Sequence, residues 1–363
     1  MKTTPRIAID ARMVHKSGIG TCIQHWLDGV GYDIALGNPE ELEEYRDHVP
    51  QQIPFISSIY GYKEQLKFPY GKLSKLKPDI LHIPHCNVPL FYRGKMIATI
   101  HDLTHLVYPE FLPMKLVHWY FKFIFWFVCK RANRINVVSE STKRDLLRFF
   151  KVNPEKIIVT PLGVGSEFVK KSKAEVEYLY EKFGIPKDKK IILYVGNLLP
   201  HKNLNGLLKG FAQMKGREEC KLVMVGKAFD GRTTQTIESE LGIESLLIRA
   251  GMVSQEDLVN FYNLADLFVL PSLYEGFGLP ILEAFACGTP VACSNTSSMP
   301  EVGGPLATYF DPQNPVSVAQ ALEQSIHSKG KKDEEIADWV SRFSWENCSR
   351  QIHKIAEDLY VNG

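Results

Sequence analysis

The sequence has few cysteines, and they are not clustered. The chain of 363 residues carries seven of them, an odd number, and no two form a C-x-x-C pair. This spacing argues against a framework of disulfides and against a zinc site, and it fits a protein whose thiols stay reduced in a cytoplasm. The cysteines are Cys22, Cys86, Cys129, Cys220, Cys287, Cys293 and Cys348.

An excess of charge of either sign is also missing. Lys and Arg together number 43 and Asp and Glu 41, which leaves a formal net charge of +2. A protein that binds nucleic acid usually has a strongly basic surface. We therefore expect no nucleic-acid partner.

Long apolar runs are absent as well. No window reaches the roughly 18 uninterrupted apolar residues that a membrane-spanning helix needs. The first nine residues include basic side chains but neither the apolar core nor the cleavage site of a signal peptide. We therefore expect a cytoplasmic protein, with peripheral contact to the inner face of a membrane as an option.

That option rests on residues 114–132, which are dense in aromatic side chains and also contain lysines and an arginine. One interpretation places the segment on a membrane surface, with basic groups toward anionic headgroups and aromatic rings inserted. The other buries it as a core helix of the first domain. We favour burial, because the aromatic residues do not follow one clear stripe.

The sequence does contain an alternation of short Ile- and Val-rich runs with segments of helical period. This alternation is typical of parallel sheets covered by helices, so the predicted fold class is α/β. At roughly 150 residues per domain, the length predicts about two domains. Strands are predicted in the first half at residues 6–10, 79–84, 96–101, 134–139 and 156–161, and in the second half at 190–196, 221–226, 246–250, 266–271 and 291–294.

Two series of βα units therefore follow each other, and a charged stretch between them predicts a linker. We expect an N-terminal domain over residues 1–165, a linker over 166–189 and a C-terminal domain over 190–340. Residues 341–363 are predicted to form a helix with large apolar anchors. Because exposing such groups is unfavourable, we expect this helix to pack, with the N-terminal domain as the candidate partner. The anchors are Trp345, Ile352, Ile355 and Leu359.

Residues 265–288 join a buried strand, a glycine-rich turn and a helix. In an open α/β sheet, ligands bind beyond the carboxyl ends of the strands, where this turn is expected. The backbone N–H groups of the turn would lie at a helix N-terminus and favour an anion such as a phosphate. They belong to Gly276, Phe277, Gly278 and Leu279.

Two glutamates flank this turn: Glu275 precedes it and Glu283 lies in the helix. A bound phosphate would repel a carboxylate, so the useful role of a carboxylate here is to accept hydrogen bonds from sugar hydroxyls. The alternative makes Glu275 a local cap and Glu283 a residue that interacts with the helix dipole.

The stretch EGFGLPILE, with its E-x7-E pair, resembles the retaining glycosyltransferases of family four. The resemblance extends over nearly the whole chain and is strongest over residues 190–302. It implies the GT-B fold, in which two Rossmann-like parallel-sheet domains face a central cleft. It also implies that Glu283 binds the nucleotide ribose and that Glu275 lies against the donor sugar and the loop amides.

A second match, YVGNLLPHKNLNGLLKGF, places Lys202 just before a helix. The family has a lysine here that contacts the donor diphosphate, and its charge would stabilise the leaving group. A solvated loop lysine is the alternative. Many relatives have an arginine where this chain has Asn197, so phosphate stabilisation would rest more on Lys202 and backbone amides, with His201 as a helper.

Near the start of the chain, Gly18 and Gly20 open a helix after a strand, where the family uses a glycine loop to approach the donor phosphates. Without the third glycine of the dinucleotide fingerprint, this pair gives little support to NAD binding. His101 ends a strand where the family commonly has a histidine near the donor sugar, although most histidines are structural. The neighbouring histidines lack metal-ligand spacing, so we expect no bound metal and no cofactor.

These features predict an enzyme that moves a hexose, with retention and without a metal, from a nucleotide diphosphate sugar to a hydroxyl of a saccharide or lipid-linked acceptor. Relatives that share IDAR, GIG, HD and P-x-K-N often use GDP-mannose, which we rank ahead of UDP-sugars. The catalytic candidates are Glu275, Lys202 and His101. The rival hypotheses are a non-catalytic sugar-nucleotide-binding regulatory protein and a nicotinamide-dependent oxidoreductase.

Overall fold

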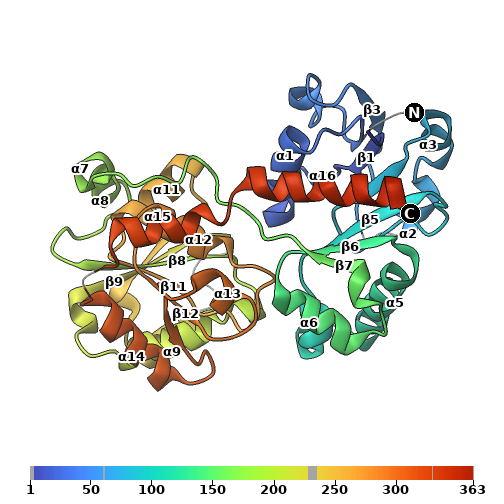
Figure 1. Ribbon diagram of the computed structural model, residues 1–363. Coiled ribbons are helices and arrows are strands. Elements are labelled where there is room, and N and C mark those ends of the chain that lie inside the picture. The colour runs from blue at the N-terminus through green and yellow to red at the C-terminus, as the bar shows by residue number, and fades with distance from the viewer. Residues whose placement is uncertain (1–3, 60–61, 228–234, 329, 363) are drawn as a thin grey trace. The chain divides into compact units, whose positions relative to one another are not determined.

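The computed structural model describes residues 4–59, 62–227, 235–328 and 330–362. The chain divides into two compact units (Figure 1). Unit 1 consists of Met1–Gly163 together with Ser344–Gly363, and unit 2 consists of Val164–Phe343. The chain therefore passes from unit 1 into unit 2 and returns once.

Unit 1 is built on a seven-stranded sheet in the order β3-β2-β1-β4-β5-β6-β7. Its strands pair in parallel, so that Ala8 of β1 lies opposite Ile34 of β2 and Leu81 of β4. Most strand residues are buried, as is usual for a parallel sheet covered by helices. The strands are β1 Ile7–Asp10, β2 Ile34–Gly37, β3 Gln51–Pro54, β4 Ile80–Ile83, β5 Lys95–Ile100, β6 Arg134–Val137 and β7 Ile157–Val159.

The last helix of the chain, α16, belongs to unit 1 and packs on α1. Trp345 stacks on His25 with 4.3 Å between ring centroids, and Trp26 Nε1 donates a hydrogen bond to Cys348 Sγ at 3.3 Å. The α-helices of unit 1 are α1 Ser17–Gly29, α2 Tyr62–Lys67, α3 Tyr70–Leu76, α4 Thr104–Val107, α5 Lys115–Arg131, α6 Glu140–Phe149 and α16 Trp345–Asn362. Its short 3-10 turns are η1 Glu43–Tyr45, η2 Pro109–Phe111 and η3 Pro154–Lys156.

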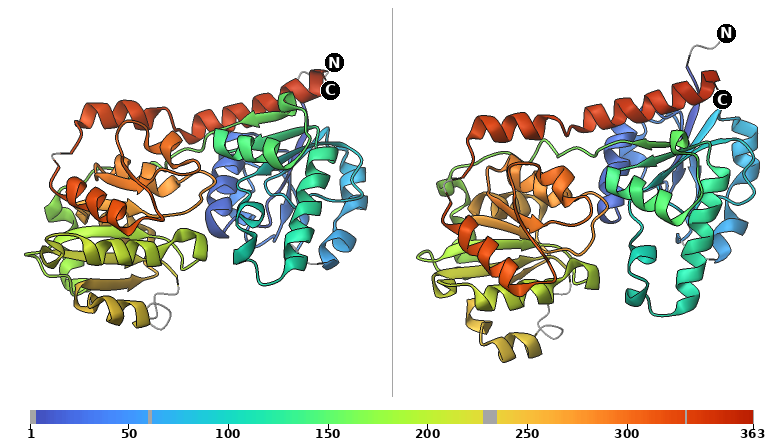
Figure 2. Two further views of the ribbon diagram at one scale, coloured as in Figure 1. Left: turned by 90° about the horizontal axis from the view of Figure 1, so that it is seen from below. Right: turned by 60° about the horizontal axis from the view of Figure 1, so that its bottom comes forward.

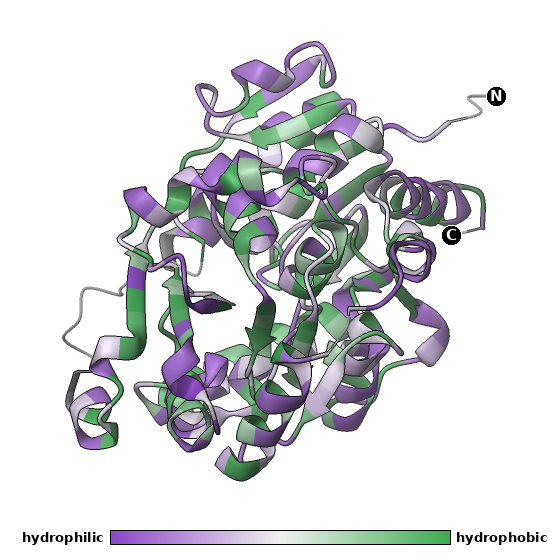
Figure 3. Cartoon of the chain, turned by 90° about the vertical axis from the view of Figure 1, so that its left-hand side faces the viewer, coloured by the Kyte–Doolittle hydropathy of each residue, from purple (hydrophilic) through white to green (hydrophobic). Residues whose placement is uncertain are grey.

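Unit 2 is built on a six-stranded parallel sheet in the order β10-β9-β8-β11-β12-β13. Figure 3 shows apolar residues concentrated in the strands, while the helices mix apolar and polar residues. The strands are β8 Lys190–Val195, β9 Cys220–Val225, β10 Leu247–Gly251, β11 Leu267–Leu270, β12 Val291–Ser294 and β13 Thr308–Phe310.

In unit 2, polar side chains cap the helices that begin at Gln255 and at Pro315. Ser254 Oγ accepts a hydrogen bond from Asp257 N at 3.1 Å, and Asn314 Oδ1 accepts one from Val316 N at 3.1 Å. The α-helices are α7 Lys173–Val176, α8 Tyr178–Lys182, α9 Leu204–Gln213, α10 Gln235–Leu241, α11 Gln255–Leu264, α12 Leu279–Ala286, α13 Met299–Gly303, α14 Pro315–Ile326 and α15 Asp333–Ser341. The 3-10 turns are η4 Pro200–Lys202, η5 Arg217–Glu219 and η6 Glu244–Leu246.

The structure assigns residues 166–189 to unit 2 rather than to a linker. This stretch forms α7 and α8, whose Val176 and Leu179 are buried. Its charged side chains contact α11, where Lys182 Nζ lies 2.7 Å from Asp257 Oδ2. The polar composition that predicted a linker therefore reflects pairing with a neighbouring helix.

The C-terminal segment also differs from the prediction. Unit 2 extends to Phe343, past the expected boundary at residue 340, and the helix of unit 1 begins at Trp345. The break between α15 and α16 is visible in both views of Figure 2, where the two red helices follow each other. The four predicted anchors of this helix are buried within unit 1.

Each sheet has a point where the order of its strands reverses. In unit 1 it lies between β1 and β4, and in unit 2 between β8 and β11. The loops that leave the carboxyl ends of two such strands diverge and open a crevice suited to a ligand. Of the predicted site residues, Lys202 and Glu275 follow β8 and β11, the two strands at the switch point of unit 2.

Candidate functional site

The loops after β8 and β11 are tied to each other by hydrogen bonds. Leu273 N donates to His201 O at 2.8 Å, and Asn203 Nδ2 donates to Pro271 O at 3.1 Å. Asn203 has a φ of 54°, in the left-handed region that asparagine tolerates, and it turns the chain into α9. Lys202, the preceding residue, is thereby held beside the loop that follows β11.

Lys202 makes an ion pair across the switch point. Its Nζ lies 2.7 Å from Oε1 and 2.9 Å from Oε2 of Glu275. The two side chains are 22% and 13% exposed, so the pair is largely shielded yet still open to a ligand. Ser272 Oγ donates a further hydrogen bond to Glu275 Oε1 at 2.6 Å, which fixes the orientation of the carboxylate.

Two serines that follow β12 hold the backbone of the glycine-rich turn. Ser298 is fully buried, and its Oγ bonds the carbonyl oxygens of Glu275 at 2.9 Å and Phe277 at 2.7 Å. Ser297 Oγ accepts a hydrogen bond from Glu275 N at 3.0 Å. The backbone of the turn is therefore held on both sides of Gly276.

Gly278 allows α12 to start where it does. Its φ of 108° is a conformation that side chains other than glycine strain to adopt, and the helix begins at the next residue, Leu279. The first N–H groups of a helix have no acceptor within it, and they lie at the positive end of its dipole. Within α12, Pro280 has no N–H and Ile281 N already donates to Gly278 O at 3.0 Å, so the helix start offers Leu279 N as a donor that suits an anion.

Glu283 lies within α12 and accepts a hydrogen bond from Tyr262 Oη at 2.7 Å. Burial raises the pKa of Glu283 to about 7; the Tyr262 hydrogen bond opposes this rise and the charge of Glu167 adds to it. This carboxyl group consequently changes its charge close to neutral pH, unlike an ordinary glutamate.

Asn197 is exposed at the carboxyl end of β8, and its Oδ1 accepts a hydrogen bond from Lys227 N at 3.2 Å. This contact links the loops after β8 and β9. Because the Asn197 side chain is uncharged, it adds no positive charge to these loops. In this loop, the cation in contact with Glu275 is Lys202.

His101 follows β5 in unit 1. Its Nε2 lies 3.0 Å from Pro84 O, which can only accept a hydrogen bond, so the proton belongs on Nε2 and Nδ1 is left as an acceptor. Burial lowers the pKa of His101 to about 4, although the hydrogen bond to Pro84 and the charge of Asp102 act in the opposite direction. The imidazole is therefore neutral at pH 7.

The two glycines of the first helix have different surroundings. A Cβ on Gly20 would lie 2.7 Å from Met13 O and 2.8 Å from Val14 O, so the packing of the backbone itself requires glycine there. Gly18 is exposed, and a Cβ on it would meet nothing within 4 Å. An approach of ligand phosphates to this loop stays a prediction.

The predicted site residues thus fall into two groups. Lys202 and Glu275 are in direct contact in unit 2, which also holds Glu283, Asn197 and the turn from Gly276 to Leu279, whereas His101, Gly18 and Gly20 belong to unit 1. Among the described residues, no group of three or more His, Cys, Asp or Glu side chains is arranged to hold a metal ion.

Comparison with known proteins identifies the family. Residues 32–168 match Glycosyltransferase Family 4, and residues 176–339 match Glycosyl transferases group 1. The O-antigen chain mannosyltransferase B of Escherichia coli is 31% identical over 285 residues, which cover 77% of this chain and 74% of that protein. The chain belongs to glycosyltransferase family four.

Two further comparisons extend over nearly the whole chain. The MMP alpha-(1->4)-mannosyltransferase of Mycolicibacterium hassiacum is 26% identical over 92% of this chain and 88% of its own length. The crystal structure of Anabaena Alr3699/HepE in complex with UDP and glucose superposes with a TM-score of 0.76 at 18% identity, covering 97% of this chain and 99% of that one. The predicted family and GT-B fold are confirmed, and the chain is a glycosyltransferase.

The candidate site also includes polar residues that no motif in the sequence indicated. Ser272 and Ser298 follow the ends of β11 and β12, and serines at strand ends on the carboxyl edge are a signal that could have marked them. Tyr262 sits inside α11 and meets Glu283 only through folding, so no local pattern indicates it. Asn203 belongs to the P-x-K-N stretch, but the sequence does not indicate that its side chain joins two loops.

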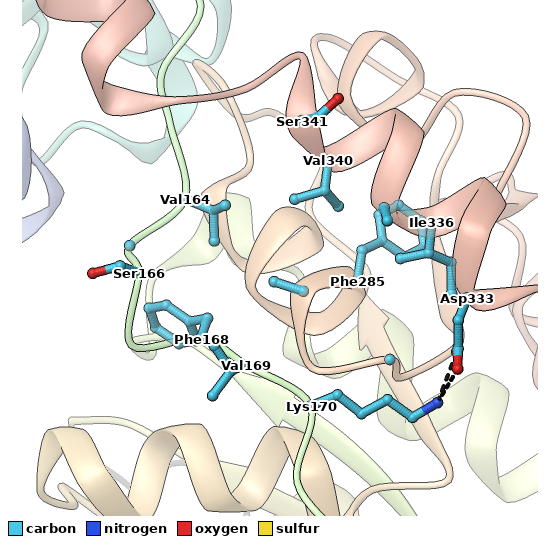
Figure 4. A pocket seen from close by; sticks show the side chains of 14 residues that line it. Val164, Ser166, Phe168, Val169, Lys170, Phe285, Asp333, Ile336, Val340 and Ser341 are labelled. Carbon is cyan, nitrogen blue, oxygen red and sulfur yellow. Dashed lines mark hydrogen bonds and ion pairs between the residues drawn. The ribbon is translucent and has the colours of Figure 1, made fainter.

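Unit 2 also contains a cavity of about 520 Å³ (Figure 4). It lies between residues 164–170, the end of α12 and α15, and apolar side chains such as Phe168, Ile336 and Val340 line most of it. At its edge, Lys170 Nζ pairs with Asp333 Oδ1 at 2.7 Å. The cavity shares no lining residue with the Lys202–Glu275 site. Some of its lining residues lie close in the sequence to the two points where the chain passes from one unit to the other.

Proposed function

We propose that this glycosyltransferase moves a mannosyl group from GDP-mannose to a hydroxyl of a saccharide or lipid-linked acceptor, with retention of the anomeric configuration. Both relatives described above are named mannosyltransferases, which supports mannose. One is an O-antigen chain enzyme, which supports a saccharide acceptor. UDP-glucose is the donor to test against GDP-mannose, because the Anabaena structure holds UDP and glucose.

The observation that carries the proposal is the contact between Lys202 and Glu275 at the switch point of unit 2. A donor diphosphate brings negative charge, and charge on its bridging oxygen increases as the glycosidic bond breaks. Lys202 and the N–H groups at the start of α12 would stabilise that charge. Glu275 would accept hydrogen bonds from hydroxyl groups of the donor sugar.

Glu283 is assigned to the nucleotide ribose. An ionised carboxylate can accept hydrogen bonds from both ribose hydroxyls, whereas a protonated carboxyl group has less capacity to accept them. The hydrogen bond from Tyr262 holds one carboxylate oxygen in place, so the group is oriented before the nucleotide binds. His101, neutral and with Nδ1 as an acceptor, is the candidate in unit 1 for a hydroxyl of the donor sugar.

In the proposed transfer, the acceptor oxygen attacks the anomeric carbon on the face from which the diphosphate leaves. The bond from this carbon to the diphosphate oxygen breaks, the bond to the acceptor oxygen forms, and a phosphate oxygen takes the acceptor proton. Such a transfer needs no base from the protein. We also propose that it needs no metal ion, with Lys202 and the backbone amides supplying the positive charge.

A thermal-shift panel tests the donor class. A ligand that binds the folded state raises the melting temperature, so GDP and GDP-mannose are expected to raise it more than UDP, UDP-glucose, UDP-N-acetylglucosamine or NAD. The rise should be unchanged by EDTA. A rise with the uridine nucleotides alone would overturn the choice of GDP-mannose, and a rise that EDTA abolishes would overturn the metal-independent mechanism.

Kinetics of variants then test the roles of the residues. Lys202→Ala should lower kcat by about 10²–10³-fold, the cost of removing one group that stabilises transition-state charge, with a smaller effect on the KM for the donor. Lys209→Ala, an exposed lysine on the adjacent helix α9, is the matched control and should leave both constants unchanged. Equal kcat values for Lys202→Ala and the wild type would refute the assignment. Retention is tested by the anomeric NMR signal of the first product.

A further inference from the structure

One helix of unit 1 is apolar on two faces. The inner face of α5 is buried in the core through Phe121, Ile124, Phe125 and Val128. Its outer face leaves a second row of large apolar side chains in solvent. Their exposed fractions are 68% for Leu116, 62% for Trp119, 48% for Phe123 and 47% for Trp126.

These four side chains form one continuous stripe, which we call the outer stripe of α5. Their spacing of three, four and three residues places them on one side of a helix with 3.6 residues per turn. The rings of Phe123 and Trp126 lie 5.9 Å apart, centroid to centroid. Scattered exposed apolar residues are normal, but a contiguous apolar patch usually marks a surface that binds a partner.

The charged side chains of α5 itself are all basic. From residue 115 to 131 the helix has no Asp or Glu, and its exposed lysines include Lys115, Lys122 and Lys130. Lys122 Nζ lies 5.0 Å from the centroid of the Trp119 ring, so charge and aromatic surface are interleaved. One exposed acidic residue, Glu110, lies before the helix in η2.

Further positive charge gathers at the C-terminal end of α5. Burial lowers the pKa of Lys156, and the charges of Arg131, Arg134 and Lys130 lower it further, which shows that these groups lie within electrostatic reach of each other. The charge of Arg93 acts on Arg131 in the same way. The C-terminal end of α5 therefore adds basic side chains to the lysines beside the outer stripe.

We propose that the outer stripe of α5 docks on the surface of a bilayer that contains anionic phospholipids. Two indole rings and a phenyl ring would enter the headgroup region, which Trp side chains favour because they have an apolar body and a polar N–H. The lysines beside them would face lipid phosphates. The helix would lie along the surface: no helix of the residues that the structure describes is long and apolar enough to cross a membrane.

The charges also decide between a lipid surface and a second copy of the chain. In a symmetric dimer built on the outer stripe, the lysines of the two copies would be brought near each other without acidic partners on α5. Lysine is also depleted at the centres of protein interfaces in general. An anionic bilayer satisfies the same lysines. The surface lies in unit 1, and the inference does not depend on the donor proposed for unit 2.

Vesicle flotation of the full-length protein tests the proposal. The protein should float with vesicles of phosphatidylcholine and phosphatidylglycerol, not with vesicles of phosphatidylcholine alone, and added salt should weaken the binding. The double variant Trp119→Ser/Trp126→Ser should lower the partition coefficient by at least about tenfold, because two large apolar side chains no longer leave water. Lys115→Gln/Lys122→Gln should also reduce binding to the anionic vesicles.

Matched variants separate the outer stripe from general surface effects. Met252→Ser/Val316→Ser removes two exposed apolar side chains of unit 2, and Lys209→Gln/Lys215→Gln removes two exposed lysines there; both should bind vesicles as the wild type does. Unchanged melting temperatures show that the variants are folded. The proposal is overturned if the wild type binds neither vesicle or both equally, or if Trp119→Ser/Trp126→Ser binds undiminished. It is also overturned if that variant instead converts a dimer to a monomer in light scattering.

Discussion

At the scale of single residues, the role proposed for Glu283 would make donor binding depend on pH. Its pKa is raised to about 7, so near that pH part of the population must lose a proton before the carboxylate can accept hydrogen bonds from a ribose. Binding therefore releases protons, and affinity for the donor nucleotide should rise as pH rises through about 7 and then level off. Isothermal titration across this range measures the effect.

The conservative variant makes this prediction specific. Glu283→Gln cannot titrate, so its nucleotide affinity should be weaker and nearly independent of pH. Glu256→Gln, an exposed glutamate on α11, should keep the pH profile of the wild type. A wild-type affinity that stays constant through this pH range would argue against a role for Glu283 at the nucleotide.

Arg12 shows how a residue in a short motif depends on a distant partner. It is buried, and its Nη2 lies 2.6 Å from both Asp10 Oδ2 and Glu64 Oε1. Burial alone would raise the pKa of Asp10, but Arg12 and His85 outweigh it and hold that pKa well below its usual range. The guanidinium is thus the main compensation for two carboxylates removed from water.

Removing this guanidinium should be costly. Arg12→Met leaves the two carboxylates buried without their cation, which typically costs about 3–5 kcal/mol of unfolding free energy. Arg350→Met is the control, since the pair of Arg350 with Glu346 is exposed and worth about 0–1 kcal/mol. Urea denaturation followed by circular dichroism compares the two. A loss for Arg12→Met as small as that for Arg350→Met would contradict the argument.

The residues that sequence could and could not reveal differ in how local their signals are. Glu275, Glu283 and Lys202 stand in short motifs, and the structure places Lys202 and Glu275 in contact. Glu64 is 52 positions from Arg12 and Tyr262 is 21 positions from Glu283, so these pairings exist only once the chain has folded. Sequence patterns therefore indicated the charged groups. The partners that set the orientation and the pKa of these groups are brought to them only by folding.

At the scale of elements, the turn before α12 depends on Gly278. Replacing it with alanine forces a side chain into a φ of 108° and should cost about 1–2 kcal/mol of unfolding free energy. Because this turn carries the N–H groups proposed to bind phosphate, Gly278→Ala should also weaken donor binding. Gly242→Ala is the control: it has a φ of 64° and lies outside the proposed donor site, after α10.

Melting curves and donor titrations on both variants give the answer. Both should lose stability, whereas donor affinity should fall for Gly278→Ala alone. If the two variants bind the donor equally well, the turn contributes to folding and not to phosphate binding.

The elements also show where sequence patterns stop being informative. Every strand predicted from the sequence is present, but β2, β3 and β13 were not predicted. β3 and β13 lie at the edges of their sheets, and QQIP and TYF have no long apolar run to mark them. Likewise α5 is apolar on both faces, and its composition predicted burial. In the structure only one of these faces is buried in the core of unit 1.

At the scale of the whole molecule, the division into two units was predictable but the route of the chain was not. Alternating strand and helix patterns occur twice, which indicates two sheets. The charged residues over 166–189 did not indicate that they pair with α11. The helical pattern at the C-terminus did not indicate a break at residues 342–344. The last helix of the chain therefore completes the first unit.

Because each unit has its own sheet, we expect the two units to unfold separately. The unfolding of multidomain chains commonly departs from two-state behaviour, so calorimetry should resolve two transitions. Ile352 of α16 is 1% exposed in unit 1, and Ile352→Ala should lower the stability of that unit by about 2–5 kcal/mol. The donor nucleotide, bound at unit 2 in our proposal, should raise the other transition.

The assignment of each transition follows from combining the two changes. In Ile352→Ala with the nucleotide present, the transition of unit 1 should fall while that of unit 2 rises, because the mutation and the ligand act on different units. Val361→Ala, at a position 75% exposed on the same helix, should leave both transitions in place. A single transition that shifts with either change would mean that the units unfold as one cooperative body, and α16 would then stabilise the whole chain rather than unit 1.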